Sequence, residues 1–318
     1  MKFGTIVPMI GATAGSDALD AVCASAEVNG LDSLWVVDHI LLPHSIGAQY
    51  PYNLTGEWML GTGQWWDAFS VLAYVAARTE RVQLGTGVIV LPYRHPANTA
   101  KIVATIDQLS RGRLVFGLGV GWMEDEFRNL GLETFHHRGA LVDEQIEVFK
   151  ELWTNDPASY AGRYYQINAV SCTPRPYQQP HPPLLVGGNT DAALRRAGEA
   201  CDGWFSISIS PAELRERRRV MDTAAEAAGR DPATLDIQML HGIRITDDAD
   251  ERATLSDYDR GQAIVGTVEQ VVEELREFEA AGLTQLVGLA RLPGQPNTLD
   301  ATLESIAFTM QELAPRLR

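Results

Sequence analysis

The sequence predicts an α/β fold, namely one (β/α)8 TIM barrel over residues 1–318 with insertions at the C-terminal face of the strands. Eight short apolar runs alternate with amphipathic segments of helical spacing in one unbroken series. No linker rich in Pro, Ser or Gly divides the chain in half. A chain of 318 residues fits either two average domains or one barrel, and this alternation favours a single domain.

The apolar runs are rich in β-branched residues and are expected to form buried parallel strands. They are residues 3–7, 33–37, 82–90, 114–118, 184–186, 204–209, 235–245 and 285–289. The first helix should open at Ser16 and place Leu19, Val22, Cys23 and Ala26 on one face. The other helices are expected at residues 66–78, 97–109, 138–153, 190–200, 211–228, 267–281 and 298–313.

Three segments are longer than the loops that connect strands and helices in a simple barrel. Residues 43–64 are rich in Tyr, Trp, Gly and Pro, and residues 155–183 end in a Pro-rich stretch. An acidic stretch follows the seventh strand and contains Asp247, Asp248, Asp250 and Glu251. The first and the third segments follow strands directly, which in a barrel places them at the catalytic mouth, where long loops commonly serve as lids or binding loops.

Composition excludes several classes of protein. The formal net charge is 26 − 41 = −15, with a sequence pI near 4.9, so the chain lacks the basic face that binds a nucleic-acid backbone. Its three cysteines form no C-x-x-C pair, which argues against a disulfide framework or a zinc site, and we expect no metal. No apolar run approaches the length of a membrane span, and we expect a cytoplasmic protein without membrane contact.

Active sites of such barrels are built from residues that follow the strands. Asp38 and His39 follow the second strand, where they fit an acid/base site, although a backbone-bonded Asp and a packed His are an equally simple interpretation. The third strand contains Gly85-Thr86-Gly87-Val88. Glycines there indicate either a kink against which a flat ring can lie or a barrel corner that needs small residues.

The ends of the fourth and fifth strands are also rich in glycine. The fourth ends in Gly119-Val120-Gly121-Trp122 and then Glu124-Asp125-Glu126, where the acidic residues fit either a functional site or a helix start. The fifth ends in Gly187-Gly188-Asn189-Thr190 and runs into a helix, which is an arrangement suited to binding an anion. An acidic chain that binds a phosphorylated cofactor needs such a local site.

Aromatic residues are concentrated in and after the first insert. They either line a substrate cavity or form a small satellite core that holds the insert together, and the sequence leaves both interpretations open. The residues concerned are Tyr50, Tyr52, Trp58, Trp65 and Trp66.

Taken together, these motifs resemble the luciferase-like monooxygenase superfamily, and more narrowly its branch that uses the deazaflavin coenzyme F420. The matching stretches are residues 32–39, 79–88, 94–96, 112–122, 126–127, 182–188 and 266–267. The resemblance implies a flavin-like ring lying across the strand ends, against a non-proline cis peptide that would join Gly87 and Val88.

The resemblance also implies roles for individual residues. His39 would bind or protonate the substrate, and Asp38 would contact the ring or orient His39. The phosphate would lie at the turn after the fifth strand. The expected cofactor-binding residues are Asp38, Thr86, Gly87, Val88, Val120, Gly121, Gly187, Gly188, Asn189 and Thr190, and the expected substrate-binding residues are Trp66 and Trp122.

Two departures bear on the substrate. In sugar-phosphate dehydrogenases of this superfamily a catalytic Glu follows the fourth-strand glycine, where this chain has Trp122. Their Trp after the strand-two His is replaced here at about Pro43. These differences argue against a sugar-phosphate reaction and favour a more apolar small-molecule substrate.

The resemblance therefore implies a coenzyme F420-dependent oxidoreductase that transfers a hydride to or from an organic substrate. The first alternative is an FMN-dependent monooxygenase that uses reduced flavin and oxygen. A second alternative is a catalytically idle barrel that acts as a binding protein or subunit. A homodimer is expected from the resemblance, and a separate cofactor reductase is a further expected partner.

Overall fold

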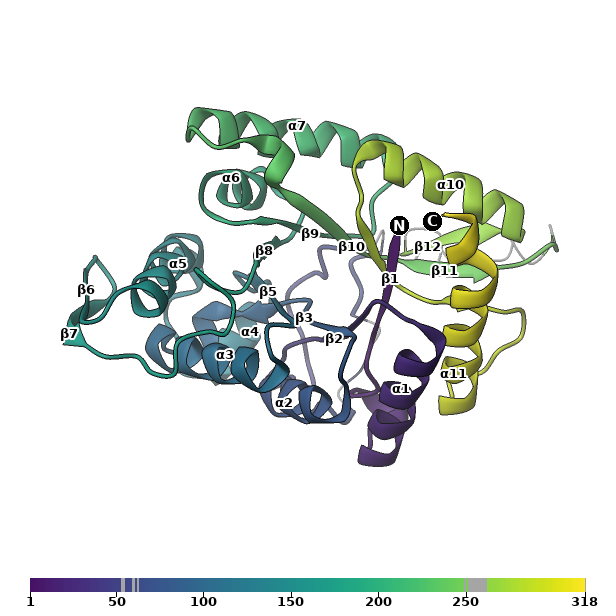
Figure 1. Ribbon diagram of the computed structural model, residues 1–318, viewed down its shortest axis with the longest axis horizontal. Coiled ribbons are helices and arrows are strands. Elements are labelled where there is room, and N and C mark those ends of the chain that lie inside the picture. Colours follow the sequence, from purple (N-terminus) through teal and green to yellow (C-terminus); the bar gives the residue numbers. More distant parts are fainter. Residues whose placement is uncertain (53–54, 59–60, 62, 249, 251–261, 318) are drawn as a thin grey trace.

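Eight parallel strands close into a barrel in this computed structural model, which describes residues 1–52, 55–58, 61, 63–248, 250 and 262–317 (Figure 1). The strands pair in the order β1-β2-β3-β5-β8-β9-β10-β13, and β13 pairs with β1. Their bounds are β1 Lys2–Ile6, β2 Ser33–Val36, β3 Gln83–Thr86, β5 Leu114–Gly119, β8 Leu184–Gly187, β9 Gly203–Ile207, β10 Asp236–Leu240 and β13 Gln285–Val287. The predicted (β/α)8 barrel is confirmed.

Helices surround the barrel and alternate with its strands (Figure 1). They are α1 Ser16–Asn29, α2 Ala68–Arg78, α3 Pro96–Ser110, α4 Glu124–Asn129, α5 Arg138–Thr154, α6 Asp191–Ala200, α7 Pro211–Ala227, α10 Val268–Ala281 and α11 Leu299–Phe308. A π-helical turn, Thr309–Leu313, ends the last predicted helix. Among the described residues, no helix combines the length and the apolar character that a bilayer crossing requires.

The barrel interior is filled by large side chains, and this filling explains a glycine in the third strand. Trp35 of β2 is fully buried and lies 4.8 Å from the ring of Phe205 between centroids. A Cβ atom on Gly85 of β3 would lie 2.3 Å from the Trp35 ring. Gly85 is therefore required by packing, because a side chain there would displace the tryptophan that fills the barrel.

Two predicted strands are divided in the structure. The run 82–90 is interrupted by a cis peptide between Gly87 and Val88, and its second part forms the short strand β4 Ile89–Val90. The run 235–245 breaks after β10, and β11 Gly242–Ile245 joins β12 Ala263–Gly266 and β14 Ala290–Arg291 in a separate three-stranded sheet. A local apolar pattern cannot show that the run 235–245 serves two sheets, because both of its parts contain buried apolar residues.

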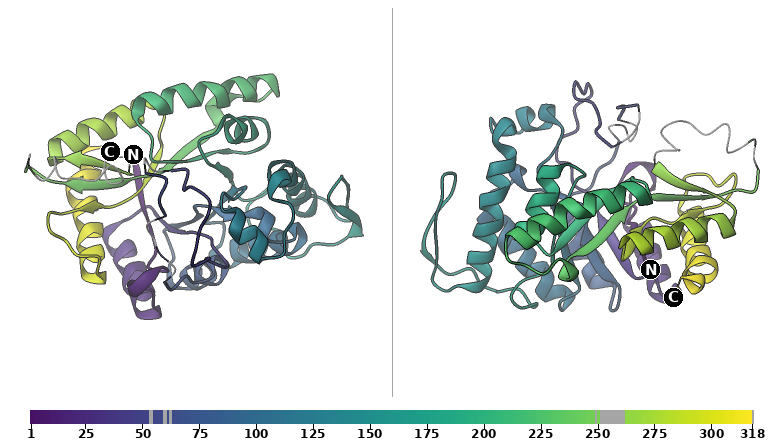
Figure 2. Two further views of the ribbon diagram at one scale, coloured as in Figure 1. Left: turned by 180° about the vertical axis from the view of Figure 1, so that it is seen from behind. Right: turned by 90° about the horizontal axis from the view of Figure 1, so that it is seen from above.

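The second insert forms a hairpin that sequence analysis did not predict. Strands β6 Ala158–Ala161 and β7 Gln166–Val170 pair antiparallel and lie at the edge of the molecule beside α5 (Figures 1 and 2). The Glu144 carboxylate of α5 accepts hydrogen bonds from the backbone N–H groups of Arg163, Tyr164 and Tyr165. The insert is thereby fixed on the outer surface. Of the acidic stretch after β10, Glu251 lies outside the described residues.

One buried histidine predicts a pH dependence of stability. His241 lies between β10 and β11, and its Nδ1 has no hydrogen-bond partner among the described residues. Burial lowers the pKa of His241 from 6.5 to about 4. Between these values the unfolded chain binds the proton and the folded chain does not, so His241 makes stability fall as the pH falls.

We expect His241→Phe to flatten the decline in the free energy of unfolding between pH 7 and pH 4. The contribution removed is on the order of 2–3 kcal/mol. Urea denaturation at the two pH values measures it, and His136→Gln, at a side chain that is 77% exposed, is the control. A variant with the same pH dependence as the wild type would show that His241 does not titrate as described.

Candidate active site

A cavity opens at the carboxyl ends of the barrel strands. Its floor is apolar and includes Val37, Val88, Ile207 and Leu240. Seven of the other lining residues were predicted from the sequence as cofactor or substrate contacts: Asp38, His39, Gly87, Val120, Gly121, Trp122 and Gly187. The structure thus brings together strand-end residues that are far apart in the chain.

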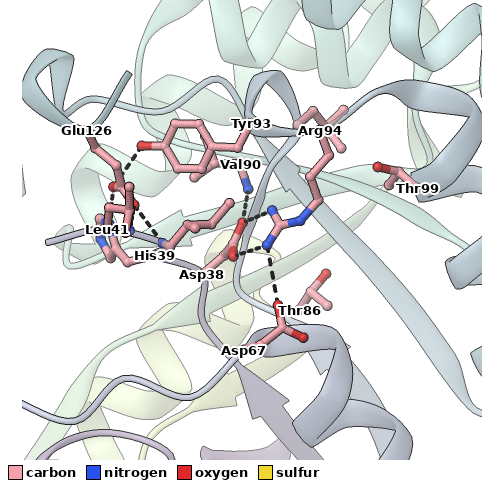
Figure 3. A network of polar contacts seen from close by, with 12 residues as sticks. Asp38, His39, Leu41, Asp67, Thr86, Val90, Tyr93, Arg94, Thr99 and Glu126 are labelled. Carbon is pink, nitrogen blue, oxygen red and sulfur yellow. Dashed lines mark hydrogen bonds and ion pairs between the residues drawn. The ribbon is translucent and has the colours of Figure 1, made fainter. Parts of the chain in front are cut away.

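A buried carboxylate orients His39. Glu126 of α4 is fully buried, and its Oε2 lies 2.6 Å from His39 Nδ1 and 2.9 Å from the Tyr93 hydroxyl (Figure 3). Its Oε1 accepts the backbone N–H groups of Ile40 and Leu41 at 2.6 and 3.0 Å. Burial opposes ionisation, but the hydrogen bonds from His39 and from the two backbone groups hold the pKa of Glu126 below its ordinary value.

The protonation of His39 follows from this arrangement. An ionised carboxylate only accepts hydrogen bonds, so we assign the hydrogen on Nδ1 of His39 as the donor to Glu126. The other ring nitrogen, Nε2, is then the atom that can exchange a proton with a bound molecule. Burial and the neighbouring Glu126 raise the pKa of Tyr93, so its hydroxyl remains a donor.

Asp38 makes a different set of contacts from those predicted. Its two carboxylate oxygens accept hydrogen bonds from Arg94 at 2.6 and 2.8 Å, and Oδ2 also accepts the Val90 N–H at 2.9 Å (Figure 3). Arg94 further approaches Asp67 at 3.7 Å. The prediction that Asp38 orients His39 is therefore replaced: Glu126 does so, because the Asp38 oxygens are held by a two-point ion pair with Arg94.

Aromatic rings form the wall around His39. The ring centroids of Trp58, Trp65 and Trp122 lie 5.2, 5.0 and 6.4 Å from that of His39, all in edge-on geometry. Trp58 also packs on Trp65, Trp122 and Tyr50 at 5.8, 5.5 and 5.4 Å. Tyr50, Trp58 and Trp65 of the first insert and its end thus line the cavity and also pack on one another.

Trp66 is placed differently from our prediction of a substrate contact. It lies in a separate hollow against α1 and α2, beside Leu19 and Tyr74, and not among the residues that line the cavity. Its neighbour Trp65 lines the cavity instead, with a backbone that pairs with Ile10.

The bulge at Gly87 and Val88 packs against two glycines of neighbouring strands. Cβ atoms on Gly119 and Gly187 would each lie 2.7 Å from a methyl group of Val88. These two glycines are therefore needed where the Val88 side chain packs against the ends of β5 and β8. Thr86 lies beneath the bulge, fully buried, and donates a hydrogen bond to the Gly117 carbonyl, so its hydroxyl does not line the cavity.

The turn after β8 connects directly to α6. Gly188 has φ +106°, a conformation that favours glycine, and Thr190 caps the helix by accepting the Ala193 N–H. The Asn189 side chain is bonded to Ser206 and Ile207 at the end of β9, so only its backbone faces this turn as a possible anion contact. The first N–H groups of α6 lack helical partners and supply the positive end of the helix dipole.

Three residues of this site, namely Glu126, Tyr93 and Arg94, were given no specific role from the sequence. Glu126 stood within an acidic triplet whose position at a helix start has its own explanation. Its partner His39 is 87 residues away, a distance over which no local pattern operates. No group of three or more His, Cys, Asp or Glu side chains suited to a metal ion occurs in the part of the chain that the structure describes.

We expect Glu126→Gln to lower the free energy of unfolding by about 2–4 kcal/mol, because an amide offers one acceptor oxygen to donors that now share two. Chemical denaturation measures the change. Glu124→Gln is the matched control, since its side chain is 42% exposed, and it should change stability by less than about 0.5 kcal/mol. Equal stability of the two variants would contradict the assigned network.

Solved structures of other proteins share this fold. A solved monooxygenase of Streptomyces bottropensis has a TM-score of 0.78 at 23% identity, with 100% of each chain covered. A solved F420-dependent secondary alcohol dehydrogenase has a TM-score of 0.77 at 20% identity, covering 100% of this chain and 99% of that chain. These two similarities are similarities of fold.

Sequence relatives give the family. This chain is 33% identical over 233 residues to an F420-dependent glucose-6-phosphate dehydrogenase of Amycolatopsis mediterranei, a match that covers 72% of this chain and 65% of that protein. The sequence profile of the family described as luciferase-like monooxygenase matches residues 1–256. The chain therefore belongs to the luciferase-like monooxygenase family of oxidoreductases.

Proposed function

We propose that this protein is a coenzyme F420-dependent oxidoreductase that transfers a hydride between the deazaflavin ring and a small organic substrate. The observation that carries the proposal is His39, held by Glu126 at the side of a cavity whose floor is the Gly87-Val88 bulge. An F420-dependent dehydrogenase among the sequence relatives supports the choice of cofactor.

The residues present fit a flat ring with a phosphate-bearing chain. Gly87, Val88, Val120 and Gly121 line the cavity with small or apolar groups against which a planar ring system can lie. At the turn after β8, Gly188 leaves the backbone open, and a Cβ atom there would lie 3.3 Å from the Tyr52 hydroxyl. That turn, with Asn189 and Thr190 at the helix start, would hold the phosphate through backbone N–H groups and the Tyr52 hydroxyl.

The bound deazaflavin would supply or accept the hydride. The protein's part is to hold the substrate oxygen at His39 Nε2 and to move one proton there. In substrate reduction, His39 gives a proton to the oxygen that becomes a hydroxyl; in oxidation, it accepts that proton. Glu126 stabilises the charged imidazolium in either direction, because its carboxylate lies 2.6 Å from Nδ1. The aromatic wall excludes water from this exchange.

Asp38 would contact the ring as a fixed group. Its hydrogen bonds from Arg94 and Val90 hold its carboxylate at the edge of the cavity floor. A homodimer stays a prediction from the family resemblance.

The second candidate is an FMN-dependent monooxygenase, favoured by the family description and by the mainly apolar cavity. In that case a separate reductase would provide the reduced flavin. Spectroscopic titration of the purified protein with F420 and with FMN distinguishes the candidates. We expect saturable binding of F420 at lower concentration than FMN. Tight binding of FMN without binding of F420 would overturn the choice of cofactor, and binding of neither would favour a catalytically idle barrel.

We expect His39→Ala to lower turnover by about 10²- to 10⁴-fold, the usual contribution of a positioned acid/base group, while the Kd for the cofactor changes little. Oxidation of reduced F420 in the presence of a panel of ketones, read with the Kd from the same titration, separates the two effects. His136→Ala is the control on the exposed surface. Loss of cofactor binding with normal turnover per bound cofactor would remove the role assigned to His39.

A further inference from the structure

Trp65 lines the cavity and carries an unused hydrogen-bond donor. Its indole Nε1 is buried without a partner among the described residues. Of the described side chains with such an atom, Trp65 is the one that lines the cavity. A buried indole N–H usually finds an acceptor, so this donor indicates that a ligand atom completes the site.

The position of Trp65 is fixed by the backbone around it. Its strand-like bridge with Ile10 is flanked by hydrogen bonds from Gly11 N to Gln64 O at 2.8 Å and from Trp66 N to Met9 O at 3.1 Å. The Trp65 ring stands edge-on to His39, with their centroids 5.0 Å apart and an interplanar angle of 89°. Two polar groups, the His39 imidazole and the Trp65 indole, therefore lie side by side in an otherwise aromatic wall.

The charged residues around the cavity indicate which ligands it can bind. Lysine and arginine are absent from the described residues that line it. Arg94 lies behind this lining and directs both terminal nitrogens to Asp38. A ligand with a phosphate or carboxylate on the aromatic side would find neither lysine nor arginine there, and the His39 ring is already paired with Glu126. Burying an anionic group on this side is therefore unfavourable.

We propose that Trp65 Nε1 and His39 form a two-point clamp for one oxygen of an uncharged, ring-containing ketone or secondary alcohol. The indole N–H donates to that oxygen, and His39 Nε2 accepts the hydroxyl hydrogen of the alcohol or, when the imidazole is protonated, donates to the ketone oxygen. The clamp rests on the proposed function, because it assumes that this cavity is the substrate site. It adds the class of substrate that the site would bind. Trp58 would pack on the ring of the substrate; its own N–H already donates to the Gly61 carbonyl at 3.2 Å. Selectivity would thus come from the Trp65 donor and from the lack of a cation.

Ligand-binding measurements on the protein without cofactor test this clamp separately from the choice of cofactor. Acetophenone is the uncharged ketone probe, α-methylstyrene is its olefin analogue without the acceptor oxygen, and benzoate is the charged analogue. Titrations followed by ligand-observed NMR should rank acetophenone first. Trp65→Phe keeps an aromatic ring but loses the donor, and it should reduce the preference for acetophenone over α-methylstyrene by about three- to tenfold.

Trp66→Phe is the matched control, because that neighbouring indole N–H lies outside the cavity and approaches Gln64 at 3.4 Å. It should leave the preference unchanged. A preference that survives Trp65→Phe, or a wild-type protein that does not prefer the ketone to the olefin, overturns the clamp. Tighter binding of benzoate than of acetophenone overturns the uncharged class of substrate.

A second measurement keeps the proposal testable if Trp65→Phe does not fold. The seven tryptophans of the ¹⁵N-labelled wild-type protein each give an indole N–H signal. Acetophenone should move one of these signals downfield, as expected for a new hydrogen bond, and α-methylstyrene should not. Equal shifts with both ligands, or no downfield shift with acetophenone, contradict donation by Trp65.

Discussion

The hydrogen bonds of the buried Glu126 carboxylate are the interaction on which the candidate site depends. One carboxylate accepts the ring of His39, the backbone of Ile40 and Leu41, and the hydroxyl of Tyr93. The loop after β2, the segment after β4 and the short helix α4 are thereby joined at a single charge. Removing that charge would leave several buried donors without an acceptor, so it fixes the local structure as well as the tautomer of His39.

The two carboxylates of the site have separate tasks. Glu126 sets the orientation of His39, whereas Asp38 neutralises Arg94 beneath the cavity. With both charges matched, the cavity offers apolar surfaces and a few polar atoms. Under the proposed function, binding of a flat, uncharged substrate would then require little rearrangement of charge, and the aromatic wall would limit the access of water.

Much of the fold and part of the site could be predicted from the sequence. The barrel follows from eight apolar runs and their alternation with helices. The glycines at the ends of β5 and β8 stand out in the sequence, but their packing against Val88 is visible only in the structure. The partner of His39 could not be predicted, because Glu126 reads locally as a favourable helix start and meets His39 only in the folded chain.

The tryptophan pair shows a second limit of the sequence. Trp65 and Trp66 are adjacent and chemically alike, so composition cannot say which faces the cavity. The bridge between Trp65 and Ile10 decides it, because neighbouring residues of an extended segment point to opposite sides. An error of one residue in register is therefore enough to exchange a cavity residue for one outside it.

The tautomer of His39 reports directly on the hydrogen bond between His39 and Glu126. Long-range ¹H–¹⁵N correlation spectra of the histidine rings distinguish a protonated Nδ1 from a protonated Nε2. Because Glu126 accepts from this ring, we expect His39 to carry its hydrogen on Nδ1, with a strongly hydrogen-bonded proton that is lost in Glu126→Gln. A neutral His39 with its hydrogen on Nε2, or a spectrum unchanged by Glu126→Gln, would contradict this assignment.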